Sequence, residues 1–245
     1  MCGEYEPTNV IAISYSGVER VLPYNYMQRQ CIEVLKLGLR GVTVVESSGD
    51  NGVGGSRFDR RAGCLGPDQA VFNPRTMSNC PYVLSVGATV MVNDTRPGRR
   101  GKFSEVATTF FPSGGGFSNV FATPVWQETA VAQYLNSAEL PFDGYVGAGL
   151  NYSKVGLEPG LLFNKAGRGY PDVSAVGDNV VIWFRDATDK IGGTSIAVPI
   201  WGAILTLINE ERLAAGKTTV GFISPVLVSS PPSRREWLMT NCAAV

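Results

Sequence analysis

The strongest candidate for chemistry is a serine at the start of a long apolar helix. Ser195 follows the pair Gly192 and Gly193, with Thr194 between, and precedes an apolar run. The two glycines remove side chains where a peptide would approach the backbone. A helix N-terminus supplies amide hydrogens and partial positive charge for a developing oxyanion. The pattern is therefore compatible with a nucleophile, although a serine in this position is also commonly a helix N-cap.

The chain contains no histidine, which limits how such a serine could be activated. A Ser-His-Asp triad cannot be built, so the proton of Ser195 must pass to another kind of base. Asp50 is the second candidate, because it follows an apolar strand in the run Ser48-Gly49-Asp50. An isolated Ser-Gly-Asp is more often an Asx-type turn. At the carboxyl end of a strand, and together with Ser195, Asp50 becomes a site candidate.

Apolar strands and helices alternate in the part of the chain that would position these residues. The sequence predicts a strand at 9–14, a helix at 23–39 and a second strand at 42–46. Uninterrupted apolar strands separated by a helix imply parallel strands with helices on the sheet faces. The remaining expectations are a strand at 83–86, a loop at 110–121, a helix at 124–135, a surface excursion at 136–169, a strand at 180–184 and a helix at 195–214.

Composition excludes several classes of partner. The 245 residues are 44% hydrophobic, enough for one substantial core. Lys and Arg together number 21, as do Asp and Glu, so no charge excess points to nucleic acid or an anionic membrane. No apolar stretch is long enough to span a bilayer. We expect a soluble monomer without nucleic-acid or membrane partners.

Five cysteines are few for a disulfide scaffold. Cys64 and Cys80 bracket a loop-like stretch and are predicted to pair, whereas Cys31 is expected to be a buried, unreactive thiol on a helix. Two glycosylation sequons, at Asn93 and Asn151, modestly favour a secreted protein.

Six segments, in order along the chain, carry a resemblance to a known family. They are Ile13–Gly17, Leu37–Gly52, Cys80–Thr89, Gly114–Asn119, Arg168–Ala175 and Gly192–Pro199. From about Val10 to Leu227 the chain resembles the sedolisin family of serine-carboxyl peptidases, particularly its fungal tripeptidyl-peptidase-like members. The resemblance implies an α/β fold, namely a subtilisin-like three-layer domain with a mainly parallel central sheet, incomplete at both ends. Residues 1–228 would form a partial catalytic domain and residues 229–245 a divergent tail.

The resemblance also implies roles for particular residues. Ser195 occupies the nucleophile position and Asp50 the oxyanion position. A carboxyl group donates a hydrogen bond to an oxyanion only while it is protonated, so such a site should work in acid. The substrate-binding candidates are the four residues of an edge segment, on which an extended peptide would pair, and two residues before the nucleophile: Ser14, Tyr15, Ser16, Gly17, Gly193 and Thr194.

Two parts of the family pattern are not matched. The family's general base is a glutamate with an aspartate one helical turn later, upstream of the strand at 9–14, and neither Glu4 nor Glu6 can be assigned to it. Glu139 and Asp143 have the right spacing, but Pro141 separates them, and we interpret them as surface charge. The family also binds calcium downstream of the nucleophile helix. Beyond Pro225 this chain has no aspartate, so calcium ligands and other metal ligands are not expected here.

The leading hypothesis is therefore a serine-type peptidase, endopeptidase or tripeptidyl peptidase, that cleaves peptide bonds at acid pH through an acyl-enzyme on Ser195. Its partner would be a peptide or protein substrate, and its location extracellular or an acidic compartment. The alternative is a catalytically inactive peptidase-like protein that binds extended peptides. The sequence does not decide between endopeptidase and tripeptidyl-peptidase action, nor does it give subsite preference.

Overall fold

A computed structural model describes residues 5–15, 17–55, 63–66, 69–95, 101–137, 140, 142–147 and 160–229. The strands are β1 (Val10–Ile13), β2 (Thr43–Ser47), β3 (Leu84–Asn93), β4 (Phe103–Ala107), β5 (Gly116–Ala122), β6 (Asp143–Tyr145), β7 (Leu161–Asn164), β8 (Gly167–Tyr170), β9 (Val173–Val176), β10 (Val180–Phe184) and β11 (Ala187–Ile191). The α-helices are α1 (Tyr24–Leu39), α2 (Glu128–Ser137), α3 (Thr194–Ala214) and α4 (Ser224–Ser229), and three short 3-10 helices are η1 (Glu19–Val21), η2 (Met77–Asn79) and η3 (Val125–Gln127).

The central sheet is mainly parallel, as the sequence predicts. Its strands lie in the order β1-β2-β3-β4, with β9 also pairing with β3. β1, β2, β3 and β9 run parallel to their partners, and β4 is antiparallel to β3. The parallel strands therefore share one carboxyl edge, and residues that follow β1 and β2 are brought to that edge.

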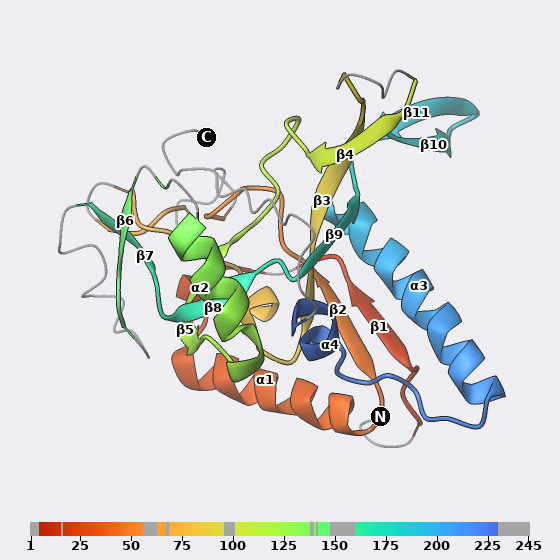
Figure 1. Ribbon diagram of the computed structural model, residues 1–245, viewed down its shortest axis with the longest axis horizontal. Coiled ribbons are helices and arrows are strands. Elements are labelled where there is room, and N and C mark those ends of the chain that lie inside the picture. Colours follow the sequence, from red (N-terminus) through yellow and green to blue (C-terminus); the bar gives the residue numbers. More distant parts are fainter. Residues whose placement is uncertain are drawn as a thin grey trace.

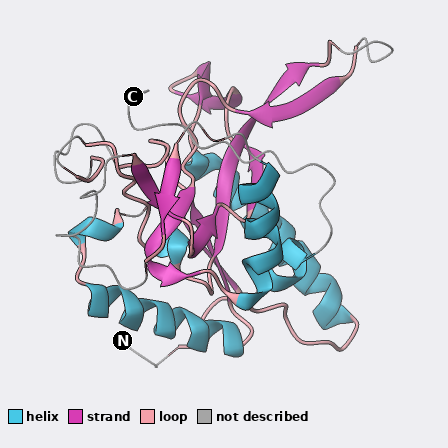
Figure 2. Ribbon diagram, turned by 60° about the vertical axis from the view of Figure 1, so that its left-hand side comes forward, coloured by secondary structure: helices cyan, strands magenta, loops and turns pink. Residues whose placement is uncertain are grey.

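Helices cover both faces of this sheet, which gives three layers (Figure 1). On one face, α1 buries Met27, Cys31 and Val34 against Val44 and Val83. On the other face, α3 buries side chains against β2 and β3, and the cluster comprises Val45, Leu84, Val86, Ala197, Val198 and Leu205. β10 and β11 form a separate antiparallel hairpin. Figure 2 shows the strands in magenta with the helices in cyan around them. None of the helices in the described ranges is long and apolar enough to cross a membrane.

The two helices that flank the sheet follow the predicted boundaries closely. α1 begins directly after Pro23, whose fixed φ suits a helix start, and Gly41 follows its end with φ 88°. α3 extends to Ala214 and contains Pro199 within its first turns. The strands at 9–14 and 42–46 are also confirmed, as β1 and β2.

The predicted loop at 110–121 is wrong in its second half. β5 begins at Gly116 and is buried from that residue to Phe121. Because glycine is depleted in strands, three successive glycines indicated a loop. Here the glycines allow close contact with a neighbouring backbone, which is a tertiary effect that composition does not report.

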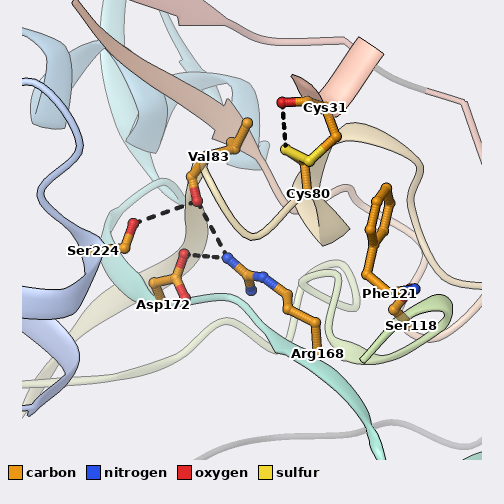
Figure 3. Close-up of a disulfide and its surroundings, with 8 residues drawn as sticks. All are labelled: Cys31, Cys80, Val83, Ser118, Phe121, Arg168, Asp172 and Ser224. Atoms are coloured by element: carbon orange, nitrogen blue, oxygen red, sulfur yellow. Dashed lines mark hydrogen bonds and ion pairs between the residues drawn. A yellow bond between two sulfur atoms is a disulfide. The ribbon is translucent and has the colours of Figure 1, made fainter. Parts of the chain in front are cut away.

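The predicted Cys64–Cys80 pair is also wrong. Cys80 forms a disulfide with Cys31 instead, across a sequence separation of 49 residues (Figure 3). The bond joins α1 to the segment that enters β3, so Cys31 is not a free thiol. Cys64 is itself disulfide-bonded.

A buried ion pair lies on the other side of the same segment (Figure 3). The guanidinium of Arg168 donates to Asp172 Oδ2 over 2.5 Å, and both side chains are fully buried. Arg168 also donates to the carbonyl of Val83, and Asp172 accepts from the backbone N–H of Ser85. Asp172 therefore ties the turn before β9 to β3.

Candidate active site

Three segments meet at the carboxyl edge of the parallel strands. β1 leads directly into Ser14, and β2 leads through Ser48 into Asp50. Because Ile13 pairs with Glu46, Ser14 lies level with the end of β2. The first turn of α3 reaches the same edge and is bonded to both segments. This is the edge at which open α/β sheets commonly bind ligands.

Asp50 is attached to the start of α3 through one oxygen of its carboxyl group. The backbone N–H of Thr194 donates to Asp50 Oδ1 over 2.7 Å, and the Thr194 hydroxyl donates to the same atom over 2.8 Å. The backbone N–H of Gly49 donates in turn to the Thr194 hydroxyl over 3.1 Å. Thr194 is buried, so these bonds are shielded from water.

These contacts distinguish the two oxygens of Asp50. Oδ1 accepts two hydrogen bonds, whereas within the described ranges Oδ2 accepts none. Oδ2 is therefore the oxygen that remains available for a further hydrogen bond. The Asx-turn interpretation is wrong, because the N–H of Gly52, which such a turn would use, donates to the carbonyl of Pro112.

Ser195 is exposed and does not cap the helix. Its hydroxyl donates to the carbonyl of Ser14 over 3.1 Å, and the Ser14 hydroxyl donates to the carbonyl of Ser195 over 3.1 Å. The residue in the N-cap position is Gly193, with no side-chain capping bond. The N-cap interpretation of Ser195 is therefore wrong, and its hydroxyl lies at the surface of the sheet edge.

Gly193 has a conformation that requires glycine. Its φ of 154° and ψ of 146° lie in a region that residues with a side chain rarely adopt. A Cβ atom placed on Gly193 would lie 3.3 Å from Asp50 Oδ2. The backbone is held there because the N–H of Gly193 donates to the carbonyl of Gly177 over 2.8 Å. The absence of a side chain thus leaves the space beside Oδ2 open.

A second glycine holds the Asp50 loop from the other side. The N–H of Gly114 donates to the carbonyl of Gly49 over 2.6 Å. A Cβ atom on Gly114 would lie only 1.9 Å from the carbonyl oxygen of Ser48. The triple-glycine segment is therefore a close backbone support for Asp50.

Curated relatives align along nearly the whole chain. Tripeptidyl-peptidase sed1 of Aspergillus fumigatus is 47% identical over 231 residues, and aorsin of Aspergillus oryzae is 45% identical over 239 residues. Tripeptidyl-peptidase 1 of Canis lupus familiaris is 36% identical over 220 residues. The alignments cover 94%, 94% and 89% of this chain, which spans 35%, 35% and 34% of the length of these relatives.

A solved structure shares the fold. Pseudomonas sedolisin, a serine-carboxyl proteinase solved with two molecules of pseudo-iodotyrostatin, superposes with a TM-score of 0.59 at 21% identity, covering 92% of this chain and 54% of that one. No protein-family model matches the chain. The chain is therefore similar to sedolisin-type peptidases along nearly its whole length. The family resemblance and the subtilisin-like α/β fold expected from the sequence are confirmed.

The edge segment of this chain is partly occupied by its own backbone. Tyr15 is 88% exposed, and Ser16 lies outside the described residues. The carbonyl of Gly17 accepts from the N–H of Thr76 over 3.0 Å, and Val18 pairs with Arg75. Of the four predicted edge residues, Ser14 and Tyr15 therefore present the stretch nearest Ser195.

The general base of the sedolisin family has no counterpart beside Ser195 in the described part of the chain. Among the residues that the structure describes, the Ser195 hydroxyl donates only to the carbonyl of Ser14. Asp143 lies in β6, where it forms an ion pair with Lys165, and the Lys165 hydrogen bond lowers the pKa of this exposed carboxyl. Asp143 thus behaves as the surface charge that the sequence predicts. Glu139 lies outside the described residues.

The family resemblance implies calcium, but the described ranges contain no calcium site. No three side chains of His, Cys, Asp or Glu gather there in an arrangement that could hold a metal ion. The residues after Ser229 lie outside the described part of the chain. No catalytic step is therefore derived through a metal ion.

Proposed function

We propose that this chain supplies the nucleophile and the oxyanion-binding group of an acid-acting serine-carboxyl peptidase, endopeptidase or tripeptidyl peptidase. The observation that supports it most is the double hydrogen bond from Thr194 to Asp50 Oδ1. It attaches the carboxyl group to the residue directly before Ser195 and leaves Oδ2 available for a further hydrogen bond. Two of the named relatives are tripeptidyl peptidases, which agrees with this chemistry.

The residues of this chain would act in sequence. The Ser195 hydroxyl loses its proton to a carboxylate base supplied from outside the described residues, and Oγ attacks the peptide carbonyl carbon. The resulting oxyanion accepts hydrogen bonds from Asp50 Oδ2–H and from the backbone N–H of Ser195, which has no partner within α3 because it lies in the first turn. The amine leaves with the proton from the base, and water then hydrolyses the ester on Ser195.

An exchange at Asp50 tests this proposal in the full-length protein. Asp50→Asn keeps the acceptor for Thr194 on Oδ1 and places an NH2 group at Oδ2, and an amide donates at every pH. We expect kcat/KM to fall about 10-fold to 1000-fold at acid pH, because the amide replaces the carboxylic acid as the donor to the oxyanion. We also expect the decline in rate toward neutral pH to be weaker than in the unchanged protein. Ser195→Ala is the matched control, expected to lose activity at all pH values.

Two results would contradict the assignment. Unchanged acid activity of Ser195→Ala would remove Ser195 as nucleophile. Wild-type rates and an unchanged pH profile for Asp50→Asn would remove Asp50 from the oxyanion site.

The second candidate is a peptidase-like protein that binds extended peptides without cleaving them. The feature that favours it is the lack of a base contacting Ser195 within the described ranges. Stoichiometric labelling of Ser195 by a peptide aldehyde at acid pH, in the full-length protein, separates the two. The segment of 245 residues alone should not be labelled, because a serine hydroxyl without a base is a poor nucleophile.

Peptides or proteins are the proposed substrates, and an extracellular space or an acidic compartment is the proposed location. Both rest on the acid chemistry of a protonated carboxyl group and on the names of the relatives. Calcium binding by the full-length protein and a monomeric state are proposed on the family resemblance.

A further inference from the structure

An exposed aromatic ring lies beside the segment that enters the nucleophile helix. Phe110 is 81% exposed, although phenylalanine is usually buried. A Cβ atom placed on Gly192 would lie 3.5 Å from Cδ1 of Phe110 and 3.2 Å from Cε1 of Phe111. Gly192 is three residues before Ser195, so the ring borders the floor on which a substrate near Ser195 would lie.

The backbone at Phe110 is held in place by a buried network. The N–H of Phe110 donates to the Thr108 hydroxyl over 3.3 Å, and that hydroxyl donates to Asp178 Oδ2 over 2.7 Å. The N–H of Asn179 donates to Asp178 Oδ1 over 2.7 Å. Thr108 and Asp178 are each 7% exposed. A carboxylate with this burial and these partners fixes the Phe110 loop to the turn that follows β9.

The same turn also holds the nucleophile segment. The carbonyl of Gly177 accepts the N–H of Gly193 over 2.8 Å. Both the aromatic loop and the glycine pair are therefore attached to Gly177–Asn179, so the backbone of Phe110 is held relative to the segment that precedes Ser195. An exposed ring on a fixed backbone contributes little to the core, but it offers an apolar surface to a bound ligand.

The order of the sheet indicates which part of a substrate the ring would contact. Ser14 follows β1, Asp50 follows β2, and Phe110 follows β4, which lies beyond β3 in the order β1-β2-β3-β4. Ser14 and Phe110 thus lie on opposite sides of Asp50. If the acyl part of a peptide pairs near Ser14, its leaving part extends toward Phe110.

We infer that Phe110 is a specificity-determining residue that binds an aliphatic or aromatic side chain within the first two residues on the leaving-group side of the scissile bond. An extended peptide advances about 3.3–3.6 Å per residue, and Gly192 is three positions before Ser195, so the first two leaving-side residues are those expected to reach the ring. This inference rests on the proposed peptidase function.

The test uses the full-length protein and internally quenched peptides at acid pH. The peptides share one acyl side and carry Leu, Phe, Gly or Asp at the first or the second leaving-side position. The unchanged protein is expected to prefer Leu and Phe over Gly by about 10-fold or more in kcat/KM at one of these positions, the size typical of an apolar subsite. Phe110→Ala should reduce that preference to about 3-fold or less while the rate on the Gly peptide stays within about 2-fold, and Phe110→Leu should restore part of it.

Phe103→Ala is the matched control, because Phe103 is also an exposed phenylalanine, in β4, at 60% exposure. It should leave the preference unchanged, and neither variant should shift the thermal midpoint appreciably. An equal loss on all peptides, a changed preference on the acyl side alone, or the same effect in both variants would overturn the inference. Absence of Ser195-dependent cleavage by the unchanged protein would instead refute the proposed function, and the inference with it.

Discussion

Replacement of Gly114 by alanine tests whether the triple-glycine segment positions Asp50. The new Cβ atom would lie 1.9 Å from the carbonyl oxygen of Ser48 and 2.5 Å from its carbonyl carbon. Real Cβ contacts are essentially never below 3.0 Å, so the two backbones must separate by about 1.1 Å. Both contacting groups are backbone atoms that cannot rotate away. The displacement therefore falls on the Ser48–Asp50 loop or on the segment before β5.

Two quantities should change together. Inserting atoms into a close-packed contact typically costs about 1–3 kcal/mol of unfolding free energy. A shift of about 1 Å in a catalytic group typically costs on the order of 100-fold in rate. The hydrogen bonds from Thr194 to Asp50 Oδ1 have lengths of 2.7 and 2.8 Å, and such a shift would lengthen or break them.

The assay is urea denaturation together with kcat/KM at acid pH, both on the full-length protein. Gly202→Ala is the control. Gly202 lies inside α3, and a Cβ atom there would be at an ordinary contact distance of 3.5 Å from the Ala12 side chain of β1. This variant should keep activity and raise stability by roughly 0.5–1 kcal/mol through helix propensity. Wild-type stability and activity in Gly114→Ala would refute the idea that this contact sets the position of Asp50.

Three further changes probe what holds the fold. Replacing Cys31 and Cys80 together by alanine should lower the unfolding free energy by about 2–4 kcal/mol, given the closed loop of 49 residues, and a urea midpoint unaffected by the change would contradict a structural role. Arg168→Met should lower the unfolding free energy by roughly 3–5 kcal/mol, because the Asp172 carboxylate is left buried without the guanidinium. The added change Asp172→Asn should recover part of that loss. No recovery in urea denaturation would count against charge as the cause. Burial raises the pKa of Tyr134 to about 12, so the folded state keeps the proton that the unfolded state releases near pH 10, and stability should fall as pH rises between about 10 and about 12. Tyr134→Phe should weaken that alkaline decline in the urea midpoint, whereas an identical decline would assign it to other groups.

Apolar periodicity predicted the elements that carry the site. β1 and β2 are signalled by short apolar runs, and α1 and α3 by longer apolar patterns of helical length. The position of Asp50 at a carboxyl edge follows from the predicted parallel strands, whereas its pairing with Ser195 was implied by the family resemblance. The predicted elements need only short-range information and the parallel arrangement.

The contacts that were missed depend on residues far apart in the chain. The pairing of Cys31 with Cys80 could not be deduced, since spacing does not determine disulfide connectivity. The strand at β5 was hidden by the three successive glycines before Phe117; Gly114 lies against the backbone of Ser48, and only the folded backbone shows that approach. The bond between Thr108 and Asp178 joins residues 70 positions apart and carries no local signal.

The resting contact of the nucleophile is compatible with the proposed chemistry. Ser195 donates its hydroxyl proton to the carbonyl of Ser14, and a hydroxyl donates only one hydrogen bond at a time. A base must therefore compete with the neutral Ser14 carbonyl for this proton. A hydrogen bond to a neutral acceptor contributes a net stabilisation of about 0.5–1.5 kcal/mol. A carboxylate acceptor contributes roughly 1.5–3 kcal/mol, so it exceeds the carbonyl whenever it is within reach. A peptide that pairs with the same Ser14 carbonyl would weaken the resting bond further, and substrate binding would thus release the hydroxyl toward the base.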